Sequence, residues 1–114
     1  MMSDCIFCRI VNKEIPANIV YEDDKILCFL DVNPQAPVHA LLIPKKHISS
    51  MDDVSVEDEE LMGHMLAKIK EIALTLELSN GYRVVNNCGE DGMQQVMHFH
   101  WHILGKRKMA WPPG

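Results

Sequence analysis

Apolar and polar residues alternate most regularly near the C-terminus, where residues 97–104 read Met-His-Phe-His-Trp-His-Ile-Leu. Successive side chains of a β-strand point to opposite faces, so the three histidines would share one face and the residues between them the other. The apolar face would pack on a core and leave a row of imidazoles facing a cleft or a metal ion. Neither packing nor strand propensity calls for histidine at these positions, so the row indicates chemistry.

Four further apolar stretches predict strands, at residues 19–22, 25–31, 38–44 and 81–87. Only Asp23-Asp24 separates the first two, which predicts a hairpin. The apolar run of the third is continuous, as is typical of a strand covered on both faces.

Two helices complete the pattern. Residues 4–11 predict a short helix that Asp4 could cap. A long helix begins at Ser55, with Asp58 placed for a capping box, and ends at Ser79-Asn80-Gly81. Its expected apolar stripe consists of Leu61, Met62, Met65, Leu66, Ile69, Ile72, Ala73 and Leu76. The sequence therefore predicts an α+β fold, with a five-stranded antiparallel sheet, one long helix and one short helix.

Composition limits the classes of protein that fit. A chain of 114 residues that is 47% hydrophobic can build one core as a single domain. Its net charge of −5 argues against a nucleic-acid partner, and no stretch is apolar and long enough to predict a membrane partner. Four cysteines without a secretory signal predict reduced thiols or metal ligands in a cytoplasmic protein.

The histidine row leaves two kinds of chemistry open. His-x-His on a strand can hold zinc, with another ligand from elsewhere in the fold. Three such positions span about 13 Å at about 3.3 Å per residue, so one metal would gather all three only across a bulge. The spacing favours one reacting histidine with neighbours that orient it. The pair Cys5-x-x-Cys8 is weak evidence for zinc by itself, because two more ligands are needed.

The loop before the histidine row contains two glycines and several amides, at residues 88–95. Its backbone N–H groups could face an anion, although an ordinary hairpin turn would have a similar composition. Its position beside three histidines favours the anion site.

The stretch 98–104 resembles the signature of the histidine triad (HIT) family, in which three histidines alternate with apolar residues. Further motifs resemble the Hint branch of that family, whose members are purine nucleoside phosphoramidases and nucleotide-binding proteins. These motifs are Ile15-Pro16-Ala17, Glu22-Asp23-Asp24, Pro34-Gln35-Ala36-Pro37, residues 43–49, Asp91-Gly92, Gly105 and Trp111-Pro112-Pro113-Gly114. The resemblance implies one HIT-like domain over residues 1–114 and a homodimer whose sheets join into ten strands.

The resemblance also implies an activity, the hydrolysis of adenosine or guanosine 5′-phosphoramidates to the nucleoside monophosphate and an amine. His100 would attack phosphorus and form a covalent nucleotidyl-histidine that water cleaves, with no cofactor for catalysis. The backbone carbonyl of His98 would orient His100, whereas His102 and His39 would take part in proton transfer to the leaving group.

The remaining roles follow from the same resemblance. Asn87 and the amides around Gln94 and Gln95 would hold the phosphate oxygens, and Asp31 would bind the ribose. The apolar slot for the purine would consist of Ile6, Phe7, Ile10, Phe29 and Val32. Trp111 would also contact the substrate. A structural zinc would take Cys5, Cys8, His47 and His98.

One departure affects the leaving-group side of the expected site. Many Hint proteins have Gly-Gln-Ser-Val before the triad, whereas this chain has Met93-Gln94-Gln95-Val96. The longer amide of Gln95 thus replaces a serine hydroxyl that would meet the leaving group.

Three alternative functions remain at this point. The first is a dinucleoside polyphosphate hydrolase, against which the terminal Trp-Pro-Pro-Gly argues. The second is a nucleotide-binding adaptor whose hydrolysis is incidental, and the third is a catalytic metal site at the triad.

Overall fold

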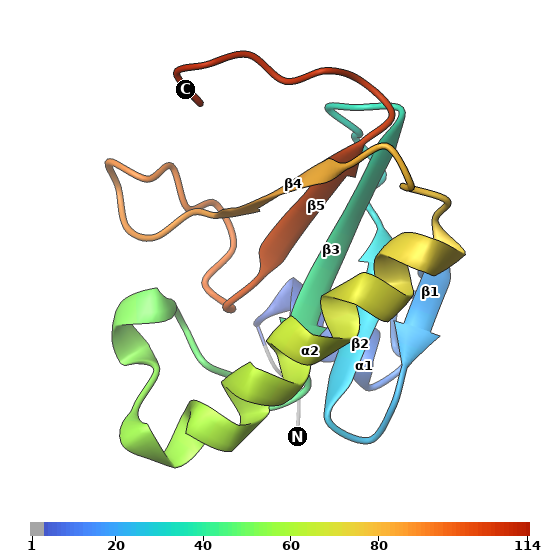
Figure 1. Cartoon of the computed structure of the whole chain (residues 1–114). Coiled ribbons are helices and arrows are strands. Elements are labelled where there is room, and N and C mark those ends of the chain that lie inside the picture. Colours follow the sequence, from blue (N-terminus) through green and yellow to red (C-terminus); the bar gives the residue numbers. More distant parts are fainter. Residues whose placement is uncertain (1–3) are drawn as a thin grey trace.

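The computed structural model describes residues 4–114 and contains one five-stranded antiparallel sheet with the strand order β1-β2-β3-β5-β4 (Figure 1). The strands are β1 (Ile19–Glu22), β2 (Ile26–Leu30), β3 (Val38–Pro44), β4 (Tyr82–Asn86) and β5 (Trp101–Gly105). The predicted α+β fold with a five-stranded antiparallel sheet is confirmed.

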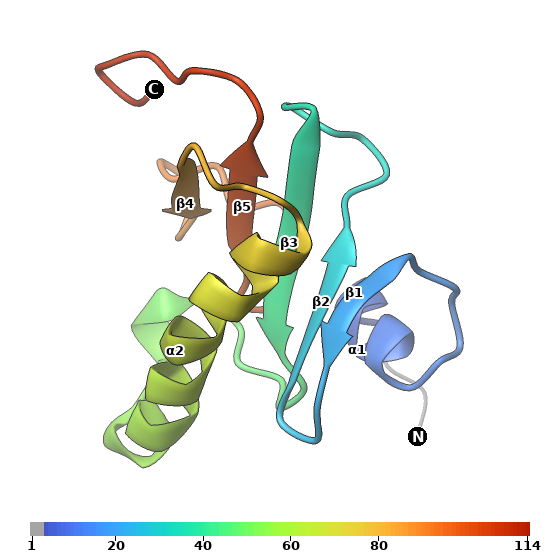
Figure 2. The same ribbon diagram turned by 45° about the vertical axis from the view of Figure 1, so that its right-hand side comes forward.

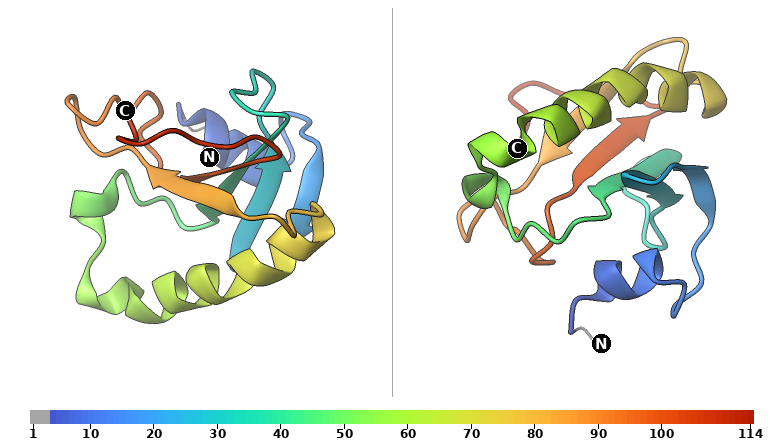
Figure 3. Two further views of the ribbon diagram at one scale, coloured as in Figure 1. Left: turned by 45° about the horizontal axis from the view of Figure 1, so that its top comes forward. Right: turned by 90° about the horizontal axis from the view of Figure 1, so that it is seen from below.

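The two helices, α1 (Ile6–Val11) and α2 (Glu59–Thr75), lie on opposite faces of the sheet (Figures 2 and 3). Successive side chains of β2 point to opposite faces of the sheet and so contribute to two hydrophobic clusters. Ile26 and Cys28 pack in the cluster under α2, whereas Leu27 and Phe29 pack in the cluster under α1. This arrangement explains the continuous apolar runs of the central strands. Within residues 4–114, no helix combines the length and the apolarity that crossing a membrane requires.

Helix α2 follows two short 3₁₀ turns, η1 (Met51–Asp53) and η2 (Val56–Asp58). The predicted capping box between Ser55 and Asp58 is present, and the Asp58 carboxylate also accepts a hydrogen bond of 2.6 Å from the Lys46 ammonium. The start of the helix is thereby attached to the loop that follows β3.

Three details of the predicted helices are wrong. Helix α2 ends at Thr75, before the predicted stop, because Glu77 turns the chain at a positive φ of 59°. Leu66 is 65% exposed and lies outside the buried stripe. Helix α1 begins at Ile6, and its N-cap is Cys5 instead of Asp4, because the Cys5 sulfur accepts the Cys8 N–H.

The fifth strand is shorter than predicted, since the ladder begins at Trp101 and the first two histidines precede it. The Phe99 N–H donates to the Ile48 carbonyl at 2.6 Å instead of to β3. Near this point Pro44 has no N–H for a ladder, which fits the end of pairing there. The predicted alternation still holds, because Phe99 and Ile103 are buried in the α2 cluster whereas the histidines face the α1 side.

Candidate active site

A cleft of about 710 Å³ opens on the α1 side of the sheet, and most of the predicted site residues line it. Helix α1, strands β2 and β3, the loop 31–35 and the segment 87–102 all contribute side chains to it. The predicted residues that line the cleft are Ile6, Phe7, Ile10, Phe29, Asp31, Val32, His39, Asn87, Gln95, His100 and His102.

His100 lies at the base of the cleft, with 5% of its surface exposed. Its Nδ1 lies 2.7 Å from the carbonyl oxygen of His98, so Nδ1 carries the proton and donates it. The other ring nitrogen, Nε2, then keeps its lone pair. The backbone carbonyl of His100 accepts a bond of 2.9 Å from the Asn86 side chain, and the Phe7 ring meets the imidazole edge-on at 5.2 Å. The ring is therefore fixed in one tautomer and one orientation.

His39 and His102 form a hydrogen-bonded pair whose tautomers the backbone sets. The Gln35 N–H donates to His39 Nδ1 at 3.0 Å, so the proton of His39 is on Nε2. That Nε2 lies 2.9 Å from His102 Nδ1, which must accept. The proton of His102 is consequently on Nε2, the nitrogen that the pair leaves available. His102 is thus a donor to whatever occupies the cleft.

Both rings of this pair are neutral near pH 7. Burial lowers the pKa of His102 to about 4, and the neighbouring His100 and His39 rings act in the same direction. Burial also lowers the pKa of His39, although the Asp31 carboxylate, 3.4 Å from its Nε2, acts against the shift.

The lowered pKa of His102 predicts a loss of stability in acid. An unfolded histidine has a pKa of about 6.5, so between pH 6.5 and about 4 the unfolded chain binds a proton here that the folded chain does not. The free energy of unfolding should therefore fall from pH 7 to pH 5. We expect His102→Gln to reduce this fall by about 1–2 kcal/mol in urea titrations at the two pH values. An equal fall in the variant and the wild type would contradict the assignment.

Hydrogen bonds from the side-chain amides of Asn87 and Gln94 hold the loop before the triad in its conformation. Gln94 Nε2 donates to the carbonyls of Ser49 and Val96, at 2.7 and 3.1 Å, and its Oε1 accepts the Gly89 N–H. The side chain of Gln94 therefore holds the loop in place and does not line the cleft, so a contact with phosphate oxygens would come from the backbone amides around it. Asn87 donates to the Gly92 carbonyl at 2.6 Å, and its amide nitrogen has a second hydrogen for a ligand.

Tight packing also restricts this loop at Gly92. A Cβ atom at that position would clash with the Cys88 carbonyl oxygen, so only glycine fits without a shift of the backbone. Because β4 ends at Asn86 and β5 begins at Trp101, the segment is a long loop and not the ordinary hairpin turn considered from its composition.

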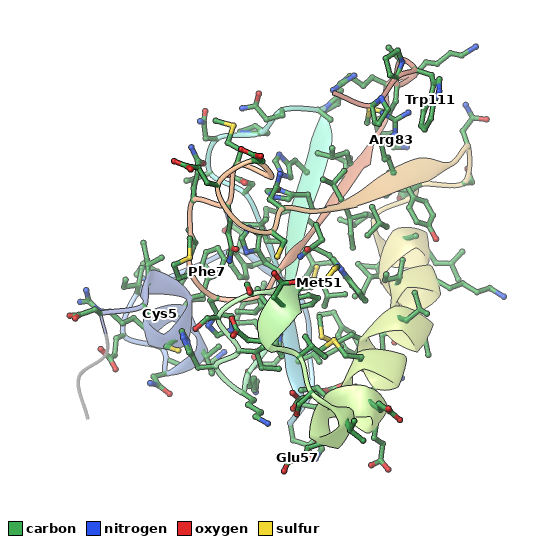
Figure 4. All side chains as sticks on the ribbon, turned by 90° about the vertical axis from the view of Figure 1, so that its left-hand side faces the viewer. Cys5, Phe7, Met51, Glu57, Arg83 and Trp111 are labelled. Atoms are coloured by element: carbon green, nitrogen blue, oxygen red, sulfur yellow. The ribbon has the colours of Figure 1, made fainter. Side chains whose placement is uncertain are left out.

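Trp111, predicted among the substrate-binding residues, lies outside the cleft of its own chain. It is 81% exposed and follows Ala110, whose carbonyl accepts a bond from Arg83. Figure 4 shows Trp111 beside Arg83 and well away from Cys5 and Phe7. Within one chain, this tail cannot reach the cleft as it is placed.

A second group of predicted residues meets behind the cleft. The Cys5 and Cys8 sulfurs and the Nδ1 atoms of His47 and His98 all lie within 4.8 Å of one another. The sulfur–nitrogen separations from Cys5 to His98, from Cys8 to His47 and from Cys8 to His98 are 3.2 to 3.5 Å. The two nitrogens lie 3.2 Å apart. Tetrahedral zinc with these ligands would have edges of about 3.3–3.8 Å. The four side chains therefore fit such an ion.

The tautomer of His98 supports the same arrangement. Its Nε2 lies 2.8 Å from the Pro44 carbonyl oxygen and must donate, which leaves the Nδ1 lone pair directed at the two sulfurs. Burial lowers the pKa of His98 to about 4, which keeps this lone pair free of a proton at neutral pH.

The three histidines of the row have separate partners. Among residues 4–114, two groups could hold a metal ion, and His98 belongs to one, His102 to the other and His100 to neither. In the second group, the proton between His39 and His102 already occupies the nitrogens that a metal would need. This geometry favours the division of labour over one metal bound by the triad.

Two hydrogen bonds in the structure were not predicted from the sequence, one at the site and one elsewhere in the fold. The Gln35 backbone sets the tautomer of the proton pair, although only the surrounding Pro-Gln-Ala-Pro motif was noted in the sequence. His64, expected at a surface or boundary position, is half-buried, and its Nε2 lies 2.7 Å from Asp23, which links α2 to the β1–β2 turn.

Comparisons with known proteins cover most or all of the chain. The model of the HIT domain family matches residues 12–109. An uncharacterized HIT-like protein of Synechocystis sp. is 53% identical over 114 residues, which is all of both chains. A solved HIT family hydrolase from Legionella pneumophila Philadelphia 1 has a TM-score of 0.94 at 49% identity, covering 97% of this chain and 100% of that one. A histidine triad nucleotide-binding protein from Candida albicans has a TM-score of 0.82 at 30% identity, with coverage of 97% and 85%.

Proposed function

The chain belongs to the HIT domain family, and on that premise we propose that it hydrolyses purine nucleoside 5′-phosphoramidates. The reaction breaks the P–N bond and releases a nucleoside monophosphate and an amine. One observation carries the proposal, namely the His100 ring at the base of an apolar cleft with its Nδ1 2.7 Å from the His98 carbonyl oxygen. The names of the Legionella hydrolase and the Candida nucleotide-binding protein support hydrolysis and nucleotide binding.

The nucleoside would occupy the apolar side of the cleft. Phe7 and Phe29 meet edge-on at 5.5 Å and, with Ile10, give a purine ring an apolar wall. Asp31 accepts the Asn33 N–H through one oxygen and has further lone pairs that can accept from ribose hydroxyls. The α-phosphorus would then lie between His100 and His102.

In the first step, the lone pair of His100 Nε2 attacks phosphorus and the P–N bond breaks. A neutral imidazole is a good nucleophile near pH 7, and the fixed acceptor behind it supports the positive charge that the ring gains. The departing nitrogen takes up a proton through the Nε2–H of His102, and Asn87 with the backbone N–H groups of the loop stabilises the phosphate oxygens.

In the second step, water cleaves the nucleotidyl-histidine. Its hydroxyl adds to phosphorus, its other proton returns to His102 Nε2, and the His100 lone pair is restored. No cofactor takes part in either step.

Incubation with adenosine 5′-phosphoramidate tests the proposal, with AMP release measured by chromatography. Diadenosine tetraphosphate serves as the competing substrate for a polyphosphate hydrolase. If AMP binds but neither compound is cleaved, the adaptor alternative is the correct one.

We propose further that Cys5, Cys8, His47 and His98 bind a structural zinc ion. Two thiolates and two imidazoles make a closed tetrahedral site without an open position for substrate. When bound, the ion supplies a cross-link between α1, the loop after β3 and the triad segment. The residue that contributes the fourth ligand, His98, also contributes the carbonyl that orients His100.

We propose also that two chains pair through β4 and α2. Strand β4 is an edge strand, and Val84 lies opposite Ile103, so its side chain points to the α2 face. Val84 is nonetheless 38% exposed, and Leu66 and Leu74 of α2 are 65% and 68% exposed. An exposed strand edge flanked by an apolar helix face is suited to pairing with a second copy, which would give ten strands.

The dimer proposal predicts the effect of one surface charge. Leu66→Asp should shift the chain from dimer to monomer in size-exclusion chromatography with light scattering, because the carboxylate would be buried without a partner. Val56→Asp is the matched control, since Val56 is 80% exposed and precedes α2. The proposal would be contradicted if the wild type were still a monomer when loaded at a concentration 100-fold higher than that used for the variant.

A further inference from the structure

A groove of about 680 Å³ on another part of the surface is lined by four cationic side chains, Arg83, Lys106, Arg107 and Lys108. Its walls come from the segment 77–83, which leads from α2 into β4, and from the segment 106–109, which follows β5. Among residues 4–114, no side chain lines both this basic groove and the cleft, and Figure 4 shows Arg83 far from Phe7. Glu77 has the only carboxylate in the described lining, so the basic groove is strongly positive.

The four cations of the basic groove have no carboxylate partner within residues 4–114. Five of the other seven lysine and arginine side chains pair with a carboxylate, at 2.6 to 3.6 Å. Unpaired cations are thus concentrated in one place although the chain carries a net charge of −5. Four like charges around one groove repel one another, and a bound anion would relieve that repulsion.

The backbone holds both guanidinium groups of the groove in place. Arg83 Nη2 donates to the Ala110 carbonyl at 2.9 Å, and Arg107 Nε donates to the Gln35 carbonyl at 3.2 Å. A guanidinium has five N–H donors, so each group keeps four that have no partner in the described part of the chain. Donors that are fixed before binding lose less conformational entropy when an anion arrives.

The backbone at Lys106 is strained in a way that bears on the groove. Its φ is 69°, in the left-handed region that favours glycine. Glycine would form this turn at lower cost, but it would remove one of the four charges. Strain of this kind at a residue other than glycine is typical of functional positions.

We propose that the basic groove binds a short chain of phosphate groups, such as a nucleoside triphosphate or inorganic tripolyphosphate carries. Three linked phosphates concentrate several negative charges, which guanidinium groups bind through paired N–H donors and lysines bind as point charges. Tyr82 lines the same groove and is 42% exposed, so its ring is available for a base to stack on. This site is separate from the cleft and does not depend on the proposed reaction.

The charge of the remaining surface limits the length of the ligand. The chain has 16 acidic and 11 basic residues, and four of the basic ones line this groove. A nucleic acid or an acidic protein would extend past the groove and meet the excess of carboxylates elsewhere. A triphosphate is short enough to contact the groove alone, and the volume of the groove is within the range of small-molecule sites.

Isothermal titration calorimetry with inorganic tripolyphosphate tests the site, with excess AMP present to occupy the cleft. We expect the double variant Lys106→Ala, Lys108→Ala to raise Kd at least about tenfold, because two of the four charges are lost. The matched control is Lys13→Ala, Lys25→Ala, which removes the same charge from two exposed lysines outside the groove and should change Kd less than about twofold. Both variants keep the cysteine–histidine cluster, so any withdrawal of metal by the phosphate chain is common to both.

ATP in the same experiment distinguishes the two sources of the phosphate chain. If the base takes part, the wild type binds ATP more tightly than tripolyphosphate, and Tyr82→Ala removes this difference without changing the Kd of tripolyphosphate. Equal Kd values for the two ligands would assign the whole affinity to the phosphate chain.

Three results would overturn the site. They are binding of tripolyphosphate that AMP abolishes or that is absent altogether, equal Kd values in the two double variants, and binding of a tetraglutamate peptide as tight as that of tripolyphosphate. Failure to cleave any phosphoramidate would contradict the proposed function and leave this site unaffected.

Discussion

Replacing His100 with alanine should lower kcat for adenosine 5′-phosphoramidate by roughly three orders of magnitude or more. The substitution removes the ring nitrogen that attacks phosphorus in the proposed mechanism, and loss of a nucleophile costs about this much or more in comparable two-step hydrolases. Steady-state release of AMP by the purified variant measures the effect.

The variant should fold and still bind AMP, because the apolar wall and Asp31 are unchanged. Equilibrium binding of AMP with an affinity near that of the wild type would show that only chemistry is lost. His64→Ala is the matched control, since His64 is half-buried and lies outside the cleft. More than a tenth of wild-type turnover in the His100 variant would contradict the mechanism.

Replacing Cys8 with serine should remove the metal and lower Tm by more than about 10 °C. Structural zinc contributes several kcal/mol or more to folding, and about 1 kcal/mol shifts Tm by roughly 4 °C in a chain of this size. Metal analysis of the purified wild type should give one zinc per chain, and the variant well below that. Differential scanning calorimetry measures the change in Tm.

Cys88→Ser controls for the loss of a thiol, because Cys88 is half-buried and belongs to neither metal-binding group. The zinc proposal fails if the wild type carries no metal after purification in zinc-containing medium and both variants melt together. Turnover by a zinc-free chain would leave the proposed reaction in place, since His100 needs only the His98 carbonyl.

The sequence predicted the fold well where a local pattern determines it. Alternation along residues 97–104 requires only that one face be buried, and Phe99 and Ile103 are buried. The end of the ladder was not predictable, because it depends on Ile48, a residue from a distant loop that takes the Phe99 N–H. The exposed Leu66 likewise depends on which face of α2 the sheet covers.

The candidate site was predicted in its residue types and less well in its contacts. The resemblance identified the four residues of the cysteine–histidine cluster, which the fold brings together from three segments. It did not show that Gln94 is used to fold its own loop, or that the Gln35 N–H fixes the tautomers of His39 and His102. Both facts depend on loop conformations that residue spacing does not specify.

The central claim is that His100 carries the nucleotide during turnover. Rapid quenching of the enzyme with adenosine 5′-phosphoramidate in alkaline denaturant, in which a P–N bond to histidine survives, tests this claim directly when mass spectrometry of the peptides follows at alkaline pH. We expect a transient AMP adduct on the peptide that contains His100, formed within the first turnover and absent from His100→Ala. Continued AMP release with no protein-bound nucleotide at any time, or with the adduct on another residue, would contradict the account.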